Sequence, residues 1–165
     1  LVADTVGMTK ATQQHGIIHF LSKVAQARNR ILPILEQHGG FEVRFMADNF
    51  IAMFDQPGDA INASSALHET FELDPIPLTD NQAYELCIGV GFGTLIHSSV
   101  LEGYFGDEMN LASKLGEDLA KGKETLMTAS AFNELPDSIK RRCSPVDPGT
   151  ATFKVQIYRL NGVHR

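Results

Sequence analysis

Apolar residues recur along this chain at two spacings, and the changes between them predict where helices and strands lie. In three segments every third or fourth residue is apolar, which is the pattern of a helix with one buried face. Between them lie short runs of branched and aromatic residues bounded by glycine, proline or polar residues, which is typical of strands. The expected helices cover residues 13–37, 59–71 and 107–121, and the expected strands cover 1–6, both halves of 41–54, 84–95, 125–128 and 152–160.

Proline, glycine and polar turns refine this division. Pro33 lies inside the first helical segment and predicts a kink or split near its end. Ala47-Asp48-Asn49 is good turn chemistry between two apolar halves, so residues 41–54 are expected to form a β-hairpin. Gly89-Val90-Gly91-Phe92-Gly93 lies within a strand, where glycine indicates a bulge or a close approach of two backbones.

Helices and strands are mixed without strict alternation, and the hairpin implies antiparallel pairing. We therefore expect an α+β fold with a mostly antiparallel central sheet flanked by helices. The length of 165 residues, 43% of them hydrophobic, suits one domain over residues 1–165. Leu1-Val2-Ala3 already has strand character with no lead-in, so we expect a truncated first strand and further, regulatory regions upstream.

Charge and composition argue against some classes of binding partner. A formal net charge of -6, without a dense run of Lys or Arg, argues against nucleic acid. No segment has the length and apolar character of a membrane span, no signal peptide is apparent, and the two cysteines form no disulfide framework. We therefore expect a cytoplasmic domain without membrane contact. A nucleotide is not excluded, because metal ions can neutralise phosphates in a cleft lined by carboxylates.

Two short stretches place a carboxylate at the end of an expected strand. Asp4 precedes Gly7 at the turn into the first helix, and Asp48 lies at the tip of the hairpin. Taken alone, each aspartate is also an ordinary turn residue. Together they could hold a pair of divalent cations, since phosphoryl transfer needs charge neutralised at both the attacking and the leaving oxygen.

A third stretch, residues 103–115, opens the last long helix. Asn110 and Lys114 are four residues apart and hence on one helical face, where both could reach the same ligand. The alternative interpretation is an ordinary amphipathic helix. Its solvated acidic face would comprise Asp107, Glu108, Glu117 and Asp118.

The order and spacing of the three stretches resemble the catalytic domain of class III nucleotidyl cyclases over nearly the whole chain. The family signature in the third stretch runs glycine, Asp or Asn, any residue, valine, asparagine, any residue, alanine, any residue, arginine, and Leu or Met. It is matched here at Gly106, Asp107, Asn110, Ala112 and Leu115. The resemblance implies the ferredoxin-like fold of these domains. It also implies conversion of a nucleoside triphosphate, with ATP the expected substrate, to a 3′,5′-cyclic nucleotide and pyrophosphate in intracellular signalling.

The resemblance further assigns roles to residues. It implies that Asp4, Asp48 and the backbone carbonyl of Thr5 bind two Mg²⁺ or Mn²⁺ ions. In the family the partner subunit supplies the asparagine that orients the ribose and the cation that stabilises the transition state, matching Asn110 and Lys114, so a head-to-tail homodimer is expected. The turn that wraps the phosphates with backbone amides is matched by Val6, Gly7, Met8 and Thr9.

Three of the departures from the family pattern bear on turnover and on the choice of base. Lys114 stands where the family prefers arginine, and lysine lacks the planar bidentate fork. At the two base-binding positions adenylyl cyclases have a lysine and an Asp or Thr, whereas this chain has Arg44 and Gly103. We therefore expect weak turnover and loose selection of the base.

Two other functions remain open at this point. A degenerate cyclase domain would bind a nucleotide or a partner without turnover, which the three departures favour and the retained Asp4, Asp48 and Asn110 oppose. A nucleotide-polymerising enzyme of the palm-like type would also use paired carboxylates, but it does not account for the Asn110 motif.

Overall fold

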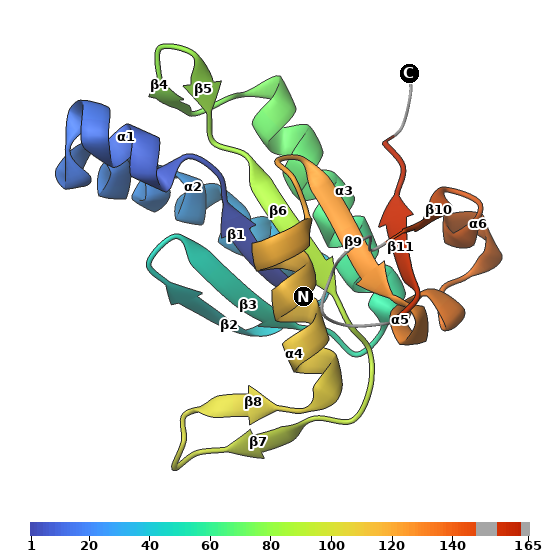
Figure 1. Cartoon of the computed structure of the whole chain (residues 1–165). Coiled ribbons are helices and arrows are strands. Elements are labelled where there is room, and N and C mark those ends of the chain that lie inside the picture. The colour runs from blue at the N-terminus through green and yellow to red at the C-terminus, as the bar shows by residue number, and fades with distance from the viewer. Residues whose placement is uncertain (148–154, 163–165) are drawn as a thin grey trace.

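The computed structural model describes residues 1–147 and 155–162, in which a seven-stranded sheet has helices on both faces (Figure 1). The strand order is β10-β11-β9-β6-β1-β3-β2, and every neighbouring pair is antiparallel except β6 and β9. This confirms the expected α+β class and the mostly antiparallel sheet. The strands are β1 (Val2–Thr5), β2 (Phe41–Met46), β3 (Asn49–Met53), β6 (Leu86–Val90), β9 (Glu124–Thr128), β10 (Cys143–Val146) and β11 (Ile157–Leu160).

Helices α2 (Ile17–Gln37) and α3 (Pro57–Leu73) cover the rear face of the sheet as seen in Figure 1. Their apolar stripes, including Phe20, Ile31 and Leu67, are almost fully buried against strand residues such as Phe50 and Ile88. This packing, rather than helix propensity alone, stabilises both helices. The main hydrophobic core therefore lies between these two helices and the central strands.

Helix α2 is not split at Pro33, which was one of the two outcomes predicted there, because it runs through this residue to Gln37. The fully buried Ile31 and Leu35 lie on either side of the proline and hold that turn against the core. The break occurs instead at Gly16, whose φ of 82° and ψ of 163° are not helical. A separate helix, α1 (Met8–His15), precedes it and directly follows β1.

On the front face lies α4 (Asp107–Lys114), which continues into a π-helical turn, η1 (Leu115–Leu119). The helix expected over 107–121 thus ends at Leu119, and its last turn is π-helical instead of α-helical. The glycine of β6 explains how closely this helix packs: a Cβ at Gly89 would lie 2.0 Å from the carbonyl oxygen of Ala112. The predicted close approach of backbones is confirmed.

Several smaller elements have no counterpart in the sequence analysis. The expected strand 84–95 ends at Val90, and the chain then forms a hairpin of β7 (Ile96–Ser98) and β8 (Gly103–Phe105). The proline-rich loop forms a second hairpin, β4 (Pro77–Thr79) with β5 (Gln82–Ala83), and α5 (Ala129–Asn133) and α6 (Asp137–Lys140) follow β9. The start of the strand expected at 152–160 lies outside the described residues. No helix in the described part of the chain is both long and apolar enough to cross a membrane.

Candidate active site

The register of the central strands brings the two predicted carboxylates together. Ala3 on β1 pairs with Phe50 on β3, so the next residue, Asp4, lies beside the start of β3. The β2–β3 hairpin closes through the pair Met46 and Asn49, which leaves Ala47-Asp48 as the turn. Asp4 and Asp48 therefore sit at the same edge of the sheet, and both are half-buried.

The electrostatics of this edge reflect that proximity. Burial raises the pKa of Asp4, the hydrogen bond from the Thr5 amide opposes the rise, and the negative charge of Asp48 adds to it. The Thr5 amide lies 2.8 Å from Asp4 Oδ1, and the Thr5 hydroxyl donates to the carbonyl of Glu85 at 3.0 Å. The amide of the next residue thus orients the Asp4 carboxylate, while burial and the charge of Asp48 disfavour its ionised form.

The turn after Asp4 leads into α1 as predicted. Gly7 adopts a left-handed φ of 100°, and a Cβ there would lie 2.5 Å from the side-chain amide nitrogen of Gln82. The amide of Val6 is already engaged, because it donates to the Glu85 carbonyl at 3.2 Å. Met8 and Thr9 form the first turn of α1, where backbone N–H groups have no acceptor within the helix.

The two predicted base-binding positions also meet. Arg44 on β2 donates to the carbonyl of Glu102, and its guanidinium lies 5.7 Å from the ring centre of Tyr104. Gly103 lies between these two contacts, at the start of β8. A Cβ at Gly103 would lie 3.2 Å from the ring of Phe105, so little room exists for a side chain. Arg44 also forms an ion pair with Glu42 at 3.8 Å.

Asn110 and Lys114 both lie on the exposed side of α4. They belong to an element other than those that carry Asp4 and Asp48. Helix α4 is held in place at its first turn by Glu108, whose carboxylate accepts from the Phe92 amide at 3.1 Å and from the Thr128 hydroxyl at 2.7 Å. The assignment of Glu108 to a solvated face is therefore wrong, because the turn faces the ends of β6 and β9.

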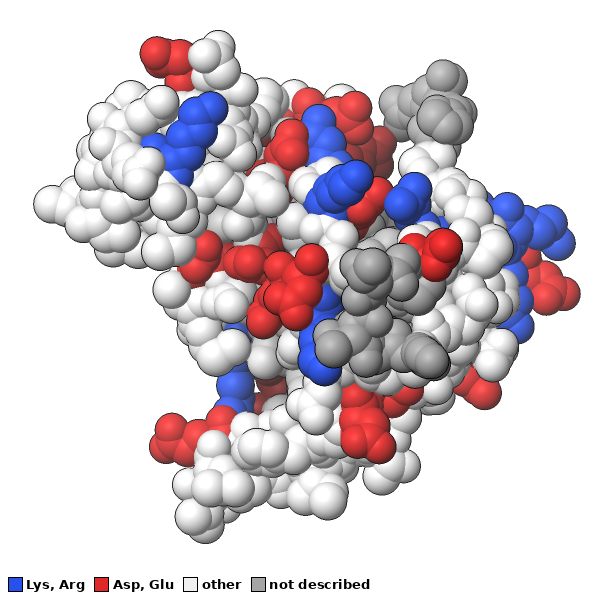
Figure 2. All heavy atoms as spheres, viewed as in Figure 1, with Lys and Arg blue, Asp and Glu red and all other residues white. Residues whose placement is uncertain are grey.

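The sequence analysis missed two residues of this region. Glu117 in the π-helical turn is exposed, as expected, but its link to the site was missed: its pKa is raised by desolvation and then by the charges of Asp4 and Asp118. Tyr84 lies buried behind Thr5; its pKa is raised foremost by burial, and the charges of Asp48, Asp4 and Arg28 all act on it. Neither position has a local sequence signal. Acidic side chains gather in the middle of this face, beside the β2–β3 hairpin (Figure 2).

The donor set suits Mg²⁺ or Mn²⁺ that arrives with a phosphate ligand. Within residues 1–147 and 155–162, no group of three or more His, Cys, Asp and Glu side chains is arranged to hold a metal by itself. Mg²⁺ is usually bound through one or two carboxylates plus substrate phosphates, and it keeps several water ligands. The Asp4–Asp48 pair, in which the charge of Asp48 helps to raise the pKa of Asp4, matches that mode rather than a closed protein cage.

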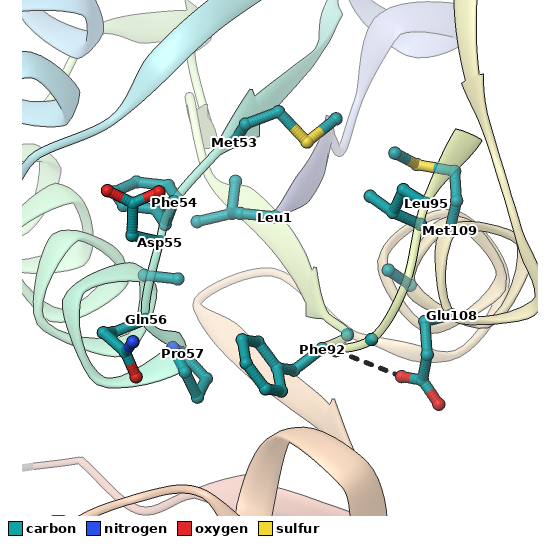
Figure 3. Close-up of a pocket in the computed structure, with 14 residues that line it drawn as sticks. Leu1, Met53, Phe54, Asp55, Gln56, Pro57, Phe92, Leu95, Glu108 and Met109 are labelled. Carbon is teal, nitrogen blue, oxygen red and sulfur yellow. Dashed lines mark hydrogen bonds between the residues drawn. The ribbon is translucent and has the colours of Figure 1, made fainter. Parts of the chain in front are cut away.

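A pocket of about 230 Å³ lies elsewhere, at the opposite ends of the same strands (Figure 3). Leu1 at the start of β1 and Met53 at the end of β3 line one side, and Phe92, Glu108 and Met109 line the other. It contains none of the predicted site residues. The candidate site is thus the carboxylate edge and not this pocket.

No family profile and no curated protein matches this sequence. Among solved structures, the catalytic core of a rhodopsin-guanylyl cyclase with converted specificity, in complex with ATPαS, matches with a TM-score of 0.82 at 15% identity, over 98% of this chain and 93% of that one. An adenylate cyclase from Trypanosoma brucei in its monomeric state matches with a TM-score of 0.75 at 18% identity, over 99% and 87%.

A third similar structure is the non-canonical dimeric guanylyl cyclase domain of the RhoGC fusion protein from the aquatic fungus Blastocladiella emersonii. Its TM-score is 0.76 at 16% identity, over 98% of this chain and 91% of that one. At such low sequence identity, structural agreement along nearly the full length of both chains shows a shared fold. This chain has the fold of the class III nucleotidyl cyclase catalytic domains.

Proposed function

We propose that this chain is a nucleotidyl cyclase domain, which converts a nucleoside triphosphate to a 3′,5′-cyclic nucleotide and pyrophosphate. The observation that carries the proposal is the meeting of Asp4 and Asp48 at one edge of the sheet, next to the start of α1, within a cyclase fold. The proposal includes a role for the cyclic nucleotide as an intracellular signal. The palm-like alternative offers no role for the exposed Asn110 and Lys114 on α4.

Asp4, Asp48 and the backbone carbonyl of Thr5 are the groups that would hold two Mg²⁺ or Mn²⁺ ions. Bound there, the ions would supply positive charge to the triphosphate and to the ribose 3′-oxygen as it loses its proton. The amides of Gly7, Met8 and Thr9 would donate to phosphate oxygens, since an anion at a helix start meets both free N–H groups and the helix dipole. The Val6 amide would contribute less to phosphate binding, because it already donates to the Glu85 carbonyl.

Asn110 and Lys114 would act on a substrate bound to a second copy of the chain. The asparagine amide would hold the ribose by hydrogen bonds, and the lysine would place a point charge near the α-phosphate as negative charge builds there. Lysine lacks the bidentate fork of arginine, so a modest rate is expected. The dimeric guanylyl cyclase domain with the same fold supports dimerisation in general, and the head-to-tail arrangement belongs to the proposal.

ATP is the proposed substrate, with loose selection of the base. Arg44 already donates to the Glu102 carbonyl, and Gly103 offers no side chain, so this subsite has few free groups for a base edge. The similar guanylyl cyclase with converted specificity, which was solved with ATPαS, supports the view that base selection can change within this fold.

The direct test is to incubate the purified domain with ATP, GTP, CTP or UTP and Mn²⁺, and to identify products by mass spectrometry. We expect a cyclic nucleotide and pyrophosphate, and a loss of about a hundredfold or more in rate for Asp4→Ala and for Asp48→Ala, because a metal ligand typically contributes several kcal/mol to the transition state.

Two controls separate the alternatives. Titration with a non-hydrolysable triphosphate analogue measures binding independently of turnover. Binding without any product from the four nucleotides would identify a degenerate domain. Product formation that survives both aspartate substitutions would contradict the metal assignment.

A further inference from the structure

The turn that carries Asp48 has an unfavourable backbone conformation. Ala47, the residue just before it, has a φ of 51°, in the left-handed region that residues with a Cβ rarely adopt. Such a conformation is unfavourable for a residue with a Cβ and persists only where the surroundings hold it. The orientation of the Ala47–Asp48 peptide therefore depends on the contacts that hold this turn.

Arg28 supplies such a contact from the middle of α2. Its guanidinium donates a hydrogen bond to the carbonyl oxygen of Ala47, which belongs to the same peptide as the Asp48 amide. The guanidinium also lies over the ring of Phe45, 4.8 Å from its centre. Phe45 packs across the hairpin on Phe50, with ring centres 5.5 Å apart, and Phe50 is only 1% exposed.

These contacts form a continuous chain from the core to the metal edge. The buried Phe50 fixes Phe45, the Phe45 ring supports the guanidinium, and the guanidinium holds the Ala47 carbonyl. The charges of Asp48, Asp4 and Arg28 all act on the pKa of the buried Tyr84.

We propose that Arg28 is a positioning residue, which holds the Ala47–Asp48 peptide in its left-handed turn and thereby sets the affinity of the Asp4–Asp48 pair for a divalent cation. This inference rests on the proposed metal-binding role of Asp48. Groups that orient a ligand to a metal typically change metal affinity by about tenfold to a hundredfold when they are removed. We expect Arg28→Ala to weaken Mn²⁺ binding by at least about tenfold on that basis.

The sign of this effect distinguishes positioning from simple electrostatics. Removing a positive charge near a cation site should by itself tighten Mn²⁺ binding, because like charges repel. A weakening therefore has to come from the released turn. Arg28→Lys keeps the charge and one donor, so its affinity should fall between those of the wild type and Arg28→Ala.

The experiment titrates Mn²⁺ alone into each variant and follows free Mn²⁺ by electron paramagnetic resonance, with thermal unfolding measured in parallel. Arg30→Ala is the matched control on the same helix, because Arg30 bonds to Asp74, with 3.1 Å to its carboxylate, and not to the hairpin. We expect Arg30→Ala to lower the unfolding temperature without changing Mn²⁺ affinity.

A rescue completes the test. Glycine adopts the left-handed conformation without steric cost, so Ala47→Gly added to Arg28→Ala should restore most of the Mn²⁺ affinity. Full affinity in Arg28→Ala while Asp48→Asn binds poorly would overturn the positioning role and leave the metal site intact. A double variant no better than Arg28→Ala would also overturn it. If Asp48→Asn binds Mn²⁺ like the wild type, the metal site itself is wrong, and this inference with it.

Discussion

Three effects act together on the ionisation of the Asp4 carboxyl group. Half-burial disfavours its charge, the Thr5 amide at 2.8 Å stabilises that charge, and Asp48 opposes it. The backbone hydrogen bond fixes the direction of one oxygen, while the other effects leave the carboxylate short of compensating charge. A divalent cation between Asp4 and Asp48 would remove the repulsion and offset part of the cost of burial.

His68 gives a prediction about acid stability that is independent of the proposed activity. Burial, and then the charge of Lys123, lower its pKa from 6.5 to about 4, and its Nε2 lies 2.9 Å from Thr125 Oγ1. The unfolded chain therefore takes up a proton between pH 6.5 and 4 that the folded chain refuses. Stability should fall as the pH drops through that window, by up to about 3 kcal/mol in the free energy of unfolding.

Urea unfolding between pH 7.5 and 4.5 measures this effect, with His68→Gln as the test variant. The difference between wild type and variant should shrink as the pH falls, because glutamine does not titrate. Lys123→Gln is the control, since removing that charge should raise the pKa of His68 and weaken the acid sensitivity. Parallel pH profiles for the wild type and His68→Gln would show that another group governs the acid response.

At the level of residues, the sequence indicated those site members that have a local signal. Asp4 lies near the end of a strand and Asp48 lies in a turn, and both features are visible within a few neighbouring residues. Glu117 and Arg28 could not be predicted in the same way. Glu117 approaches Asp4 because a helix widens into a π turn, and Arg28 reaches the hairpin across the packing of α2 on the sheet.

Among the elements, α4 depends most on close backbone packing. A Cβ at Gly89 would meet the Ala112 carbonyl oxygen at 2.0 Å and the Gly116 nitrogen at 2.6 Å, and both are main-chain atoms that cannot rotate away. Gly91 has the same relation to the Glu108 carbonyl oxygen, at 2.5 Å. Gly89 in β6 and Gly91 just after it therefore set the distance between α4 and the sheet, and with it the position of Asn110 and Lys114.

We expect Gly89→Ala to destabilise the fold by about 3 kcal/mol or more, because the new methyl group must push α4 and its π turn away from β6. Gly58→Ala in α3 is the matched control. A Cβ there meets nothing closer than 3.6 Å, and alanine favours a helix over glycine by roughly 0.5–1 kcal/mol.

The two alanine substitutions should thus act in opposite directions in chemical denaturation. A Gly89→Ala variant as stable as the wild type would mean that α4 is not seated on the strand as described. A large loss in Gly58→Ala would instead show that small changes on any face are poorly tolerated.

The elements also show where sequence patterns stop being informative. Long amphipathic helices and the hairpin at 41–54 were predicted correctly in kind, because their periodicity reports directly on a buried face. The two-residue β5 and the three-residue β7 and β8 are too short for a period to appear. The course of α2 through Pro33 depends on tertiary burial that outweighs a local propensity.

For the molecule as a whole, the proposed site divides into two groups on different elements. Asp4 and Asp48 lie at the sheet edge, whereas Asn110 and Lys114 lie on the exposed side of α4. The β7–β8 hairpin projects beyond the rest of the fold (Figure 1) and exposes apolar side chains, with Val100 89% exposed and Ile96 69% exposed. An exposed apolar arm of this kind is typical of an interface between chains.

A shared site in a head-to-tail homodimer predicts complementation between two inactive variants. A chain with Asp48→Asn keeps Asn110 and Lys114, and a chain with Asn110→Ala keeps both carboxylates, so their heterodimer contains one intact site. Each variant alone should lose about a hundredfold or more in rate, since a metal ligand or transition-state contact contributes several kcal/mol.

Cyclic nucleotide formation by the separate variants and by the co-refolded mixture measures the rescue, with heterodimers isolated through two different affinity tags. Random mixing gives about half of the dimers as heterodimers with one working site each, so up to about a quarter of the wild-type rate should return. That level stands well above the residual rate of either variant. A mixture of two Asp48→Asn chains carrying the same two tags is the control, because it can form dimers but no intact site. If tagged heterodimers are recovered and no activity returns, the two groups of residues do not meet across a dimer, and the site works within one chain or does not catalyse.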